Sequence, residues 1–169
     1  MKAITLWQPW ATLFACGAKE YETRSWATKY RGPIAIHAAA KSLRSIYKEI
    51  FPCNDYEFHP SYFVKKEFCD ALKENGINEN ELPLGCIIAT ADLVDCHKIV
   101  RHGGRGMSSE GPGWLETEDG IYIPTEQELM FGDWTPGRYA WEVKNVKMLS
   151  EPIPAKGKQR LWEWEVENE

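Results

Sequence analysis

The sequence lacks any apolar run long enough to span a membrane. Its first residues also lack the apolar segment and the small-residue cleavage site of a secretion signal. We therefore expect a cytoplasmic protein that has no membrane partner. The 169 residues fit a single domain over residues 1–169, and their 43% hydrophobic and 27% charged content is ordinary for a soluble globular protein.

The motifs of most catalytic, cofactor and metal sites are also missing. There is no GxSxG elbow, no phosphate-binding Walker loop and no dinucleotide fingerprint. The five cysteines are widely spaced and form no CxxC pair, which favours free thiols over a zinc site. Cys96, His97 and His102 lie close together, but the end of a strand followed by a polar loop explains them equally well. We therefore expect no cofactor and no metal.

Charge of one sign is missing from two stretches of the chain. Residues 24–48 hold six basic and no acidic residues, whereas residues 106–137 hold seven acidic and no basic residues. The net charge of −5 does not suggest a generic nucleic-acid binder, but segregated charge allows a local anion site. Two alternatives remain open, namely chance clustering on solvated faces and a protein partner that contacts the acidic 106–137 segment.

Tryptophan is abundant and recurs beside polar residues. The chain has eight, among which Trp7 and Trp10 flank Gln8-Pro9, and Trp26 follows Arg24 closely. Buried tryptophan usually belongs to a core or a rigid scaffold. A tryptophan beside arginine or lysine also suits a stacking wall for a nucleobase.

Hydrophobic periodicity and turn residues predict an α+β domain. The helices between residues 41 and 82 form an insertion, the glycine-rich stretch of residues 97–120 contains a flexible loop, and residues 150–157 form a proline-rich turn. Because regular βαβ alternation is absent, a small, partly closed mixed barrel is favoured over a doubly wound sheet. The expected strands cover residues 3–6, 20–26, 33–38, 85–96, 121–123, 139–148 and 160–166, and the expected helices cover residues 9–16, 41–50, 62–75 and 125–131.

The stretch Gly17–Trp26, GAKEYETRSW, has an unusual pattern for a strand. One face carries Lys19, Tyr21 and Thr23. The other face carries Glu20, Glu22, Arg24 and Trp26. Such a polar face meets water, another charged group or a ligand, and an ion pair between Glu22 and Arg24 is the simplest interpretation. Lys19 either complements the end of the preceding helix or acts as a base or nucleophile.

Five blocks of sequence resemble the ASCH family, the activating signal cointegrator homology domain of the PUA-like superfamily. The resemblance covers nearly the whole chain and is loosest over residues 47–82 and 97–120. The blocks are LWQPWA at Leu6–Ala11, GAKEYETRSW at Gly17–Trp26, YRGPIAIHAA at Tyr30–Ala39, GCIIATADLVDC at Gly85–Cys96 and PIPAKGKQRLW at Pro152–Trp162.

The resemblance implies a PUA-like β-barrel with an early helix at its mouth and a cleft for RNA, another nucleic acid or a modified nucleobase. Basic residues of this cleft would contact phosphate, tryptophans would stack on bases, and Gln8 and Glu22 would contact base edges. The family's GxKxxExR motif maps onto Gly17, Lys19, Glu22 and Arg24. The predicted binding residues are Gln8, Pro9, Trp10, Lys19, Glu22, Arg24, Trp26, Arg31, Lys156 and Lys158.

Some small members of the wider family resemble amidohydrolases that act on N4-acetylcytidine. They use a lysine, a threonine three residues later and a distal glutamate. Lys19 matches the lysine, but Glu22 stands at the threonine position and Thr23 lies one residue late. Glu126 or Glu128 matches the distal glutamate, although Glu128 also fits a capping box that begins at residue 125. Binding is therefore the leading interpretation, and a nucleoside hydrolase with Lys19 and Glu22 as catalytic candidates is the alternative.

Overall fold

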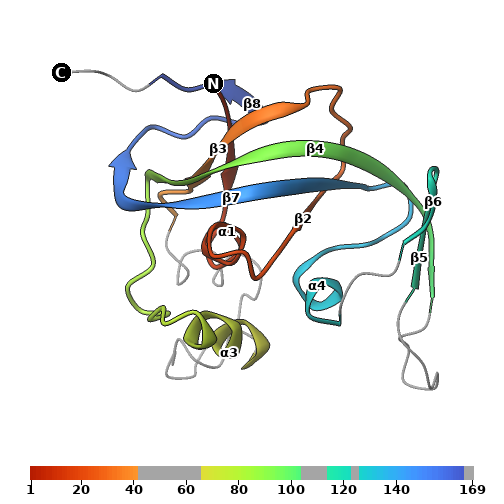
Figure 1. The fold of residues 1–169 in the computed structure, drawn as a ribbon, viewed down its shortest axis with the longest axis horizontal. Coiled ribbons are helices and arrows are strands. Elements are labelled where there is room, and N and C mark those ends of the chain that lie inside the picture. The colour runs from red at the N-terminus through yellow and green to blue at the C-terminus, as the bar shows by residue number, and fades with distance from the viewer. Residues whose placement is uncertain (42–65, 104–113, 123–125, 166–169) are drawn as a thin grey trace, which may run out of the picture. The chain divides into compact units, whose positions relative to one another are not determined.

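The chain folds into two compact units. Figure 1 labels their helices and strands and colours them by residue number. The computed structural model describes residues 1–41, 66–103, 114–122 and 126–165. Unit 1 draws on Met1–Ala18, Pro33–Ala91 and Val146–Glu169, and unit 2 draws on Lys19–Gly32 and Asp92–Asn145. In the ranges that the structure describes, no helix has the length and apolar character needed to cross a membrane.

The described elements confirm a mixed α+β fold that is dominated by strands. The strands are β1 (Lys2–Leu6), β2 (Tyr21–Arg24), β3 (Gly32–Ala38), β4 (Cys86–Gly103), β5 (Trp114–Thr117), β6 (Gly120–Tyr122), β7 (Tyr139–Pro154) and β8 (Leu161–Glu163), and the helices are α1 (Trp10–Ala15), α3 (Lys66–Glu74) and α4 (Glu126–Phe131). The sheet has eight strands in the order β2-β7-β4-β3-β1-β8, and β5 joins β4 to β6. Closure into a barrel, with the early helix at its mouth, stays a prediction.

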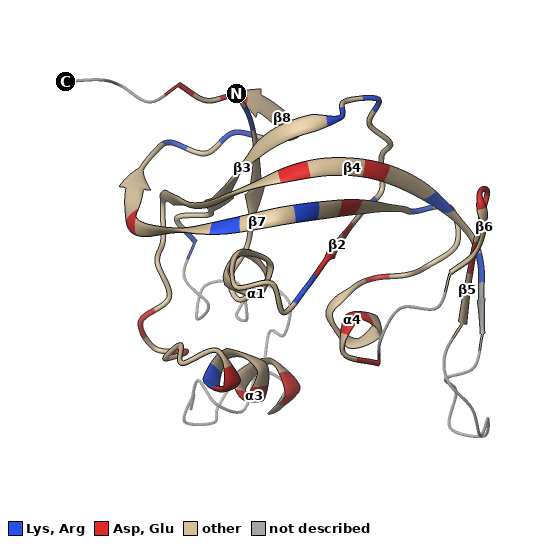
Figure 2. Cartoon of the chain, viewed as in Figure 1, with Lys and Arg blue, Asp and Glu red and all other residues tan. Residues whose placement is uncertain are grey.

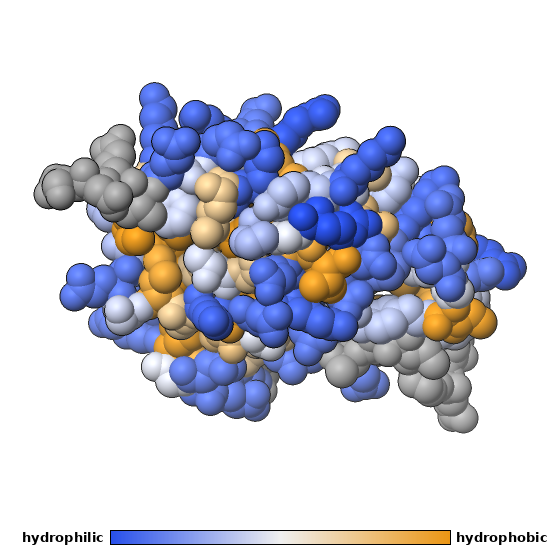
Figure 3. All heavy atoms as spheres, turned by 45° about the horizontal axis from the view of Figure 1, so that its top comes forward, coloured by the Kyte–Doolittle hydropathy of each residue, from blue (hydrophilic) through white to orange (hydrophobic). Residues whose placement is uncertain are grey.

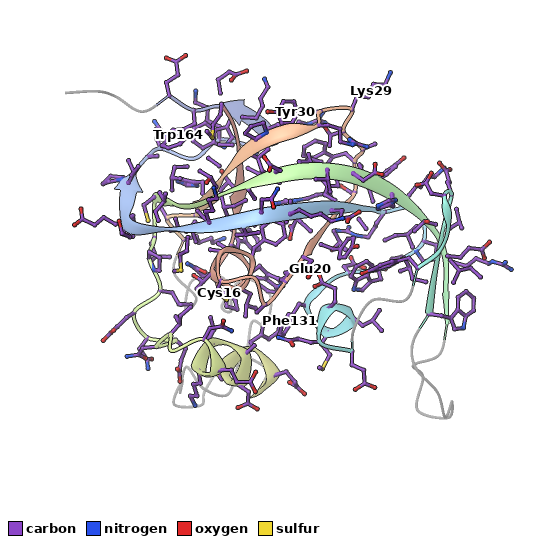
Figure 4. All side chains as sticks on the ribbon, in the orientation of Figure 1. Cys16, Glu20, Lys29, Tyr30, Phe131 and Trp164 are labelled. Carbon is purple, nitrogen blue, oxygen red and sulfur yellow. The ribbon has the colours of Figure 1, made fainter. Side chains whose placement is uncertain are left out.

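Unit 1 is built on the parallel pair β1 and β3, with β8 antiparallel on the other side of β1. Its core packs Ala3 and Ala35 against Ile87 and two tryptophans from the end of the chain, Trp162 and Trp164. The amino terminus donates a hydrogen bond to the carbonyl oxygen of Trp164, and Figure 4 labels this residue beside β8. The two chain ends that frame the unit are thus held together.

Helix α1 follows β1 directly and is buried against the unit. Pro9 precedes its first residue, and Gly17 adopts a φ of +78° after its end, as expected for a helix stop. Trp10 packs edge-on against Phe68 of α3, with 5.5 Å between the ring centroids. This contact fixes α3 against α1 on the same side of unit 1 (Figure 1).

Unit 2 is organised around antiparallel pairs. Strand β2 pairs with the first half of β7, where Glu22 lies opposite Trp141. The second half of β4 pairs with β5, and β5 pairs with β6. Its core contains side chains from five parts of the unit, namely Tyr21, Ile99, Leu115, Trp134 and Ala140.

Two expected loops are strands in the structure. Strand β4 continues past Cys96 to Gly103, so the expected loop over residues 97–120 is wrong for His97–Gly103 and for β5. Strand β7 likewise continues through Pro154, which removes the first part of the expected turn over residues 150–157. Polar residues occupy both extensions because one face of each extension meets water.

The helical insertion is described only in part. Helix α3 confirms the expected helix of residues 62–75 over Lys66–Glu74, and Gly76 follows with a φ of +71°. The helix expected over residues 41–50 lies outside the described residues, apart from Lys41. The expected single domain over residues 1–169 stays a prediction.

Candidate nucleic-acid interface

The predicted binding residues divide between the two units. Unit 1 holds Gln8, Pro9, Trp10, Lys156 and Lys158. Unit 2 holds Lys19, Glu22, Arg24, Trp26 and Arg31. The prediction that both groups line one cleft is untested, so each group is described within its own unit.

Lys19 lies just before β2 in unit 2 and is buried, with only 1% of its surface exposed. Its Nζ donates hydrogen bonds to the carbonyl oxygen of Tyr21 and to Oε2 of Glu22, the latter at 3.3 Å. Oε1 of Glu128 lies 3.9 Å from the same nitrogen. Two carboxylates therefore balance the charge of a buried ammonium group, as burial of a charge requires.

Glu128 belongs to α4 and anchors this helix to the start of β2. Its two carboxylate oxygens accept hydrogen bonds from the backbone N–H groups of Glu20 and Tyr21, at 2.8 and 3.0 Å. Figure 4 shows the labelled Glu20 beside α4. Burial raises the pKa of the Glu128 carboxyl, although Lys19 and the two N–H groups act in the opposite direction. The capping box that the sequence predicts would pair Glu128 with residue 125, which lies outside the described residues, so this role stays a prediction.

Glu22 connects Lys19 to Arg24 along the partly exposed face of β2. Nε of Arg24 lies 3.1 Å from Oε1 of Glu22, while the other oxygen of Glu22 meets Lys19. The expected Glu22–Arg24 ion pair is thus confirmed. The strand alternates as predicted, with Tyr21 and Thr23 buried and Glu22 and Arg24 half-buried.

Trp26 and Arg31 are both engaged within unit 2. The Trp26 ring packs edge-on against Trp141 at a centroid distance of 4.5 Å, and its carbonyl oxygen accepts a hydrogen bond from Nε1 of Trp141. Arg31 donates to Oδ1 of Asp95 at 2.7 Å and to two carbonyl oxygens of its own loop. Trp26 therefore has a scaffold role beside any contact with a ligand.

His97 of β4 makes a second charged cluster in unit 2. Its Nδ1 lies 3.0 Å from Asp119, and its Nε2 lies 3.2 Å from Glu142 and 3.9 Å from Asp95. Burial lowers the pKa of His97, but the hydrogen bonds to Asp119 and Glu142 and the charge of Asp95 outweigh it, and the net shift is upward. Sequence proximity to Cys96 and His102 gave no hint of these carboxylate partners.

The acidic segment at residues 106–137 is partly neutralised within unit 2. Among its described residues, five carboxylates form ion pairs with basic side chains of the same unit. The pairs are Glu116–Arg101, Glu118–Lys98, Asp119–His97, Glu128–Lys19 and Asp133–Arg138. These pairs offset part of the negative charge of the segment, and the protein partner that the sequence suggested stays a prediction.

In unit 1, Gln8 is fully buried and its amide links three segments. Nε2 donates to the carbonyl oxygen of Pro83 at 2.8 Å, and Oε1 accepts from the backbone N–H of Thr12 in α1 at 3.1 Å. The bond to Thr12 satisfies a helix N–H that has no partner within α1. Both ends of the Gln8 amide are thus used inside the protein, and Pro9 is buried beside it.

Lys156 and Lys158 line a hollow in unit 1 with a volume of about 440 Å³. Among the described residues, its wall contains three lysines and no carboxylate. The lining residues are Thr5, His37, Ala39, Ala40, Lys41, Ala155, Lys156, Gly157, Lys158 and Gln159. Figure 2 shows basic positions along the connection from β7 to β8, which supplies half of this wall.

Backbone hydrogen bonds explain why the wall residues meet. Because β1 and β3 are parallel and Leu6 lies opposite Ala38, the residues that leave both strands lie at the same edge of the sheet. The N–H of Ala39 donates to the carbonyl oxygen of Leu6 at 2.9 Å. The N–H of Gly85 donates to Ala38, and that of Ala155 donates to Gly85. The β7–β8 connection is thereby tied to the same edge.

Side chains fix the floor of the hollow. Oγ1 of Thr5 donates to the carbonyl oxygen of Lys158 at 2.9 Å and accepts from Nε1 of Trp162 at 3.1 Å. Nε2 of His37 lies 3.0 Å from the carbonyl oxygen of Ala155, and burial lowers the pKa of this histidine. A neutral His37 that donates from Nε2 satisfies the Ala155 carbonyl.

A family model described as the ASCH domain matches residues 4–153. The chain belongs to the ASCH domain family. Activating signal cointegrator 1 from Homo sapiens is 31% identical to it over 101 residues, and the protein of the same name from Mus musculus is 30% identical over 101 residues.

Each of these alignments covers 55% of this chain and 14% of the relative. This chain therefore matches only a small part of the length of the cointegrators. The family that the five sequence blocks predicted is confirmed. Members of the ASCH domain family are associated with RNA binding.

Proposed function

We propose that this ASCH domain is an RNA-binding module, and that the hollow of unit 1 binds the phosphate backbone. One observation carries the proposal, namely a wall whose described residues include Lys41, Lys156 and Lys158 and no carboxylate. Within the described residues, Lys156 and Lys158 form no ion pair with a carboxylate. Their charge is thus available to phosphate, and phosphate contacts dominate the affinity of RNA-binding proteins.

The GxKxxExR strand of unit 2 is the second proposed contact. Glu22 holds Arg24 on the partly exposed face of β2, and 27% of the Arg24 side chain is exposed. The positive charge of a guanidinium attracts phosphate also where a carboxylate contacts it. Lys19 and Glu22 in this arrangement orient Arg24 for a ligand.

Binding of a fluorescently labelled single-stranded RNA, measured at several salt concentrations, tests the proposal. For single strands the slope of log affinity against log salt changes by about 0.7 for each phosphate contact. The double variant Lys156→Ala/Lys158→Ala is expected to lose affinity and about 1.4 of this slope. Lys147→Ala is the matched control, because Lys147 is an exposed lysine of unit 1 that does not line the hollow.

Arg24→Ala tests the unit 2 contact separately. It is expected to weaken RNA binding and to reduce the salt slope by less than the Lys156→Ala/Lys158→Ala variant does. If the wild-type protein shows no salt-dependent binding to RNA or DNA, the proposed function is wrong. If Lys147→Ala changes the RNA affinity and its salt slope as much as the Lys156→Ala/Lys158→Ala variant does, the hollow is not the phosphate site.

A hydrolase of N4-acetylcytidine-like nucleosides is the second candidate, and the contact between Lys19 and Glu128 favours it. This contact supplies the distal glutamate that the amidohydrolase-like members use. Lys19 would act as base or nucleophile with Glu22 assisting. However, its Nζ is enclosed by a carbonyl oxygen and two carboxylates, which suits an ion pair better than a nucleophile.

Release of acetate from acetylated cytidine, compared between the wild type and Lys19→Met, tests the hydrolase. Turnover by the wild type alone would support it. No turnover, or equal turnover by both proteins, would exclude it.

A further inference from the structure

Trp7 is an exposed tryptophan at the edge where β1 leaves the sheet of unit 1. Its surface is 43% exposed, although large aromatic side chains are mostly buried in folded proteins. The two tryptophans that the sequence proposed for stacking are otherwise engaged, since Trp10 packs against Phe68 and Trp26 packs against Trp141. Trp7 therefore offers more indole surface to a ligand than either of them.

Lys41 places Trp7 at the rim of the hollow. Nζ of Lys41 lies 5.2 Å from the centroid of the Trp7 ring, within the range of a cation–π contact, and Lys41 also lines the hollow. The parallel register of β1 and β3 brings these two residues together, because Trp7 follows Leu6 and Lys41 follows Ala38 by three residues. Figure 3 shows one face of the molecule, on which hydrophobic patches lie among mostly hydrophilic side chains.

We propose that Trp7 and the hollow form one nucleotide subsite for single-stranded nucleic acid. A base stacks on the Trp7 indole, and the adjoining phosphate enters the hollow between Lys41, Lys156 and Lys158. Lys41 contacts both parts of the nucleotide, because its ammonium lies beside the ring and at the wall. The proposal rests on the proposed RNA-binding function and adds to it the stacking residue and the single-stranded form of the ligand.

Stacking on an indole determines whether the subsite binds single-stranded or duplex nucleic acid. A base in a duplex is covered on both faces by its neighbours, whereas a base in a single strand is free to stack on an aromatic side chain. The subsite therefore selects single strands and tolerates any base, since every base has a π-face. The three lysines of the wall attract the phosphate of any nucleotide, so sequence preference is expected to be weak.

Three variants separate the roles of stacking and charge. The probe is a labelled oligouridine of about 10 nucleotides, the size of a typical single-strand site, compared with an RNA duplex of the same length. Trp7→Ala is expected to weaken oligouridine binding about tenfold, with its salt slope unchanged, whereas Trp7→Phe retains most of the affinity. Lys41→Ala is expected to reduce the slope by about 0.7. Trp114→Ala is the matched control, because Trp114 is an exposed tryptophan of unit 2.

The outcomes distinguish this proposal from the function on which it rests. If the wild type binds oligouridine and Trp7→Ala binds it equally well, the subsite is wrong and RNA binding stands. Tighter binding of the duplex than of oligouridine would also overturn the subsite alone. Absence of all RNA binding by the wild type would overturn both. Thermal unfolding of each variant confirms that a loss of binding is not a loss of folding.

Discussion

Oε1 of Glu128 lies 3.9 Å from Nζ of Lys19, and both side chains are almost completely buried. The two residues come from distant parts of the sequence and meet at the junction between α4 and the start of β2. The same carboxylate accepts two backbone N–H groups of that junction. Glu128 therefore joins an ion pair and a hydrogen-bond network, and its removal affects both.

Glu128→Gln is expected to destabilise the protein by about 3 kcal/mol, the cost of removing one partner from a buried ion pair. The amide also brings an N–H₂ group against one of the two backbone N–H donors that the carboxylate accepts. Urea unfolding followed by tryptophan fluorescence measures the change in the free energy of unfolding.

Lys19→Met supplies the second arm of a double-mutant cycle. The double variant Lys19→Met/Glu128→Gln is expected to lose less stability than the sum of the single variants, because neither buried charge is then left without its partner. Additive losses would show that Lys19 and Glu128 do not interact. The carboxylate of Glu22 remains 3.3 Å from Lys19 in the Glu128→Gln variant. The loss of stability is therefore expected to lie at the low end of what breaking a buried ion pair costs.

His97 predicts a pH-dependent contribution to the stability of unit 2. Hydrogen bonds to Asp119 and Glu142 raise its pKa above 6.5, despite the opposing effect of burial. A raised folded-state pKa gives stability that is complete below pH 6.5 and is lost as the pH rises through that higher pKa. The difference in stability between the wild type and His97→Gln is therefore expected to shrink from acidic to basic pH, as measured by urea unfolding.

His37 makes a contribution to stability that depends on pH in the opposite direction to that of His97. Burial lowers its pKa, so its contribution is present above pH 6.5 and is lost as the pH falls through the lower folded-state pKa. NMR titration of the two imidazole rings is expected to give a midpoint above 6.5 for His97 and below 6.5 for His37. A common midpoint for both rings would contradict the two environments that the structure shows.

The sequence predicted the elements whose signals are local. Alternation identified β1 and β2, an apolar run identified β3, and Gly17 marked the end of α1 through its need for a positive φ. The extension of β4 was missed because its stability comes from a partner strand. Lys98 and Arg101 look like loop residues on their own, but Arg101 pairs with Glu116 of β5 and Lys98 pairs with Glu118, the residue that follows β5. Such cross-strand pairs leave no local periodicity.

The sequence predicted which residues belong to the candidate site, but it did not predict which distant residues they contact. The alternation along β2 placed Glu22 and Arg24 on one face correctly, because a strand fixes which side chains share a face. It placed Lys19 on the opposite face, whereas Nζ of Lys19 contacts Glu22 in the structure. Glu128 was assigned to a local cap, since its contact with Lys19 depends on tertiary packing. Trp7 was indistinguishable from a core tryptophan until the parallel register of β1 and β3 placed it beside Lys41.

Gln8 separates two interpretations of the Gln-Pro-Trp turn. The sequence predicted a contact with base edges, whereas the structure buries the amide between Pro83 and Thr12. Gln8→Ala is therefore expected to lower the free energy of unfolding by about 2 kcal/mol, the cost of leaving buried hydrogen-bonding groups without partners. The folded variant is expected to bind oligouridine with unchanged affinity. Weaker binding without a change in stability would restore the base-edge interpretation.

Gly157 lies where the β7–β8 connection crosses the ring of His37. A Cβ atom at this position would lie 2.4 Å from Cε1 and 2.7 Å from Nδ1 of His37, closer than real Cβ contacts allow. Gly157→Ala is therefore expected to displace the lysine-bearing wall of the hollow and to cost about 1–3 kcal/mol, as overpacking does. Because the collision is with the imidazole, the cost is expected to fall sharply in a His37→Ala background. Thermal unfolding of the four proteins measures this coupling, and an equal cost in both backgrounds would place the constraint on the backbone of the connection and not on its contact with His37.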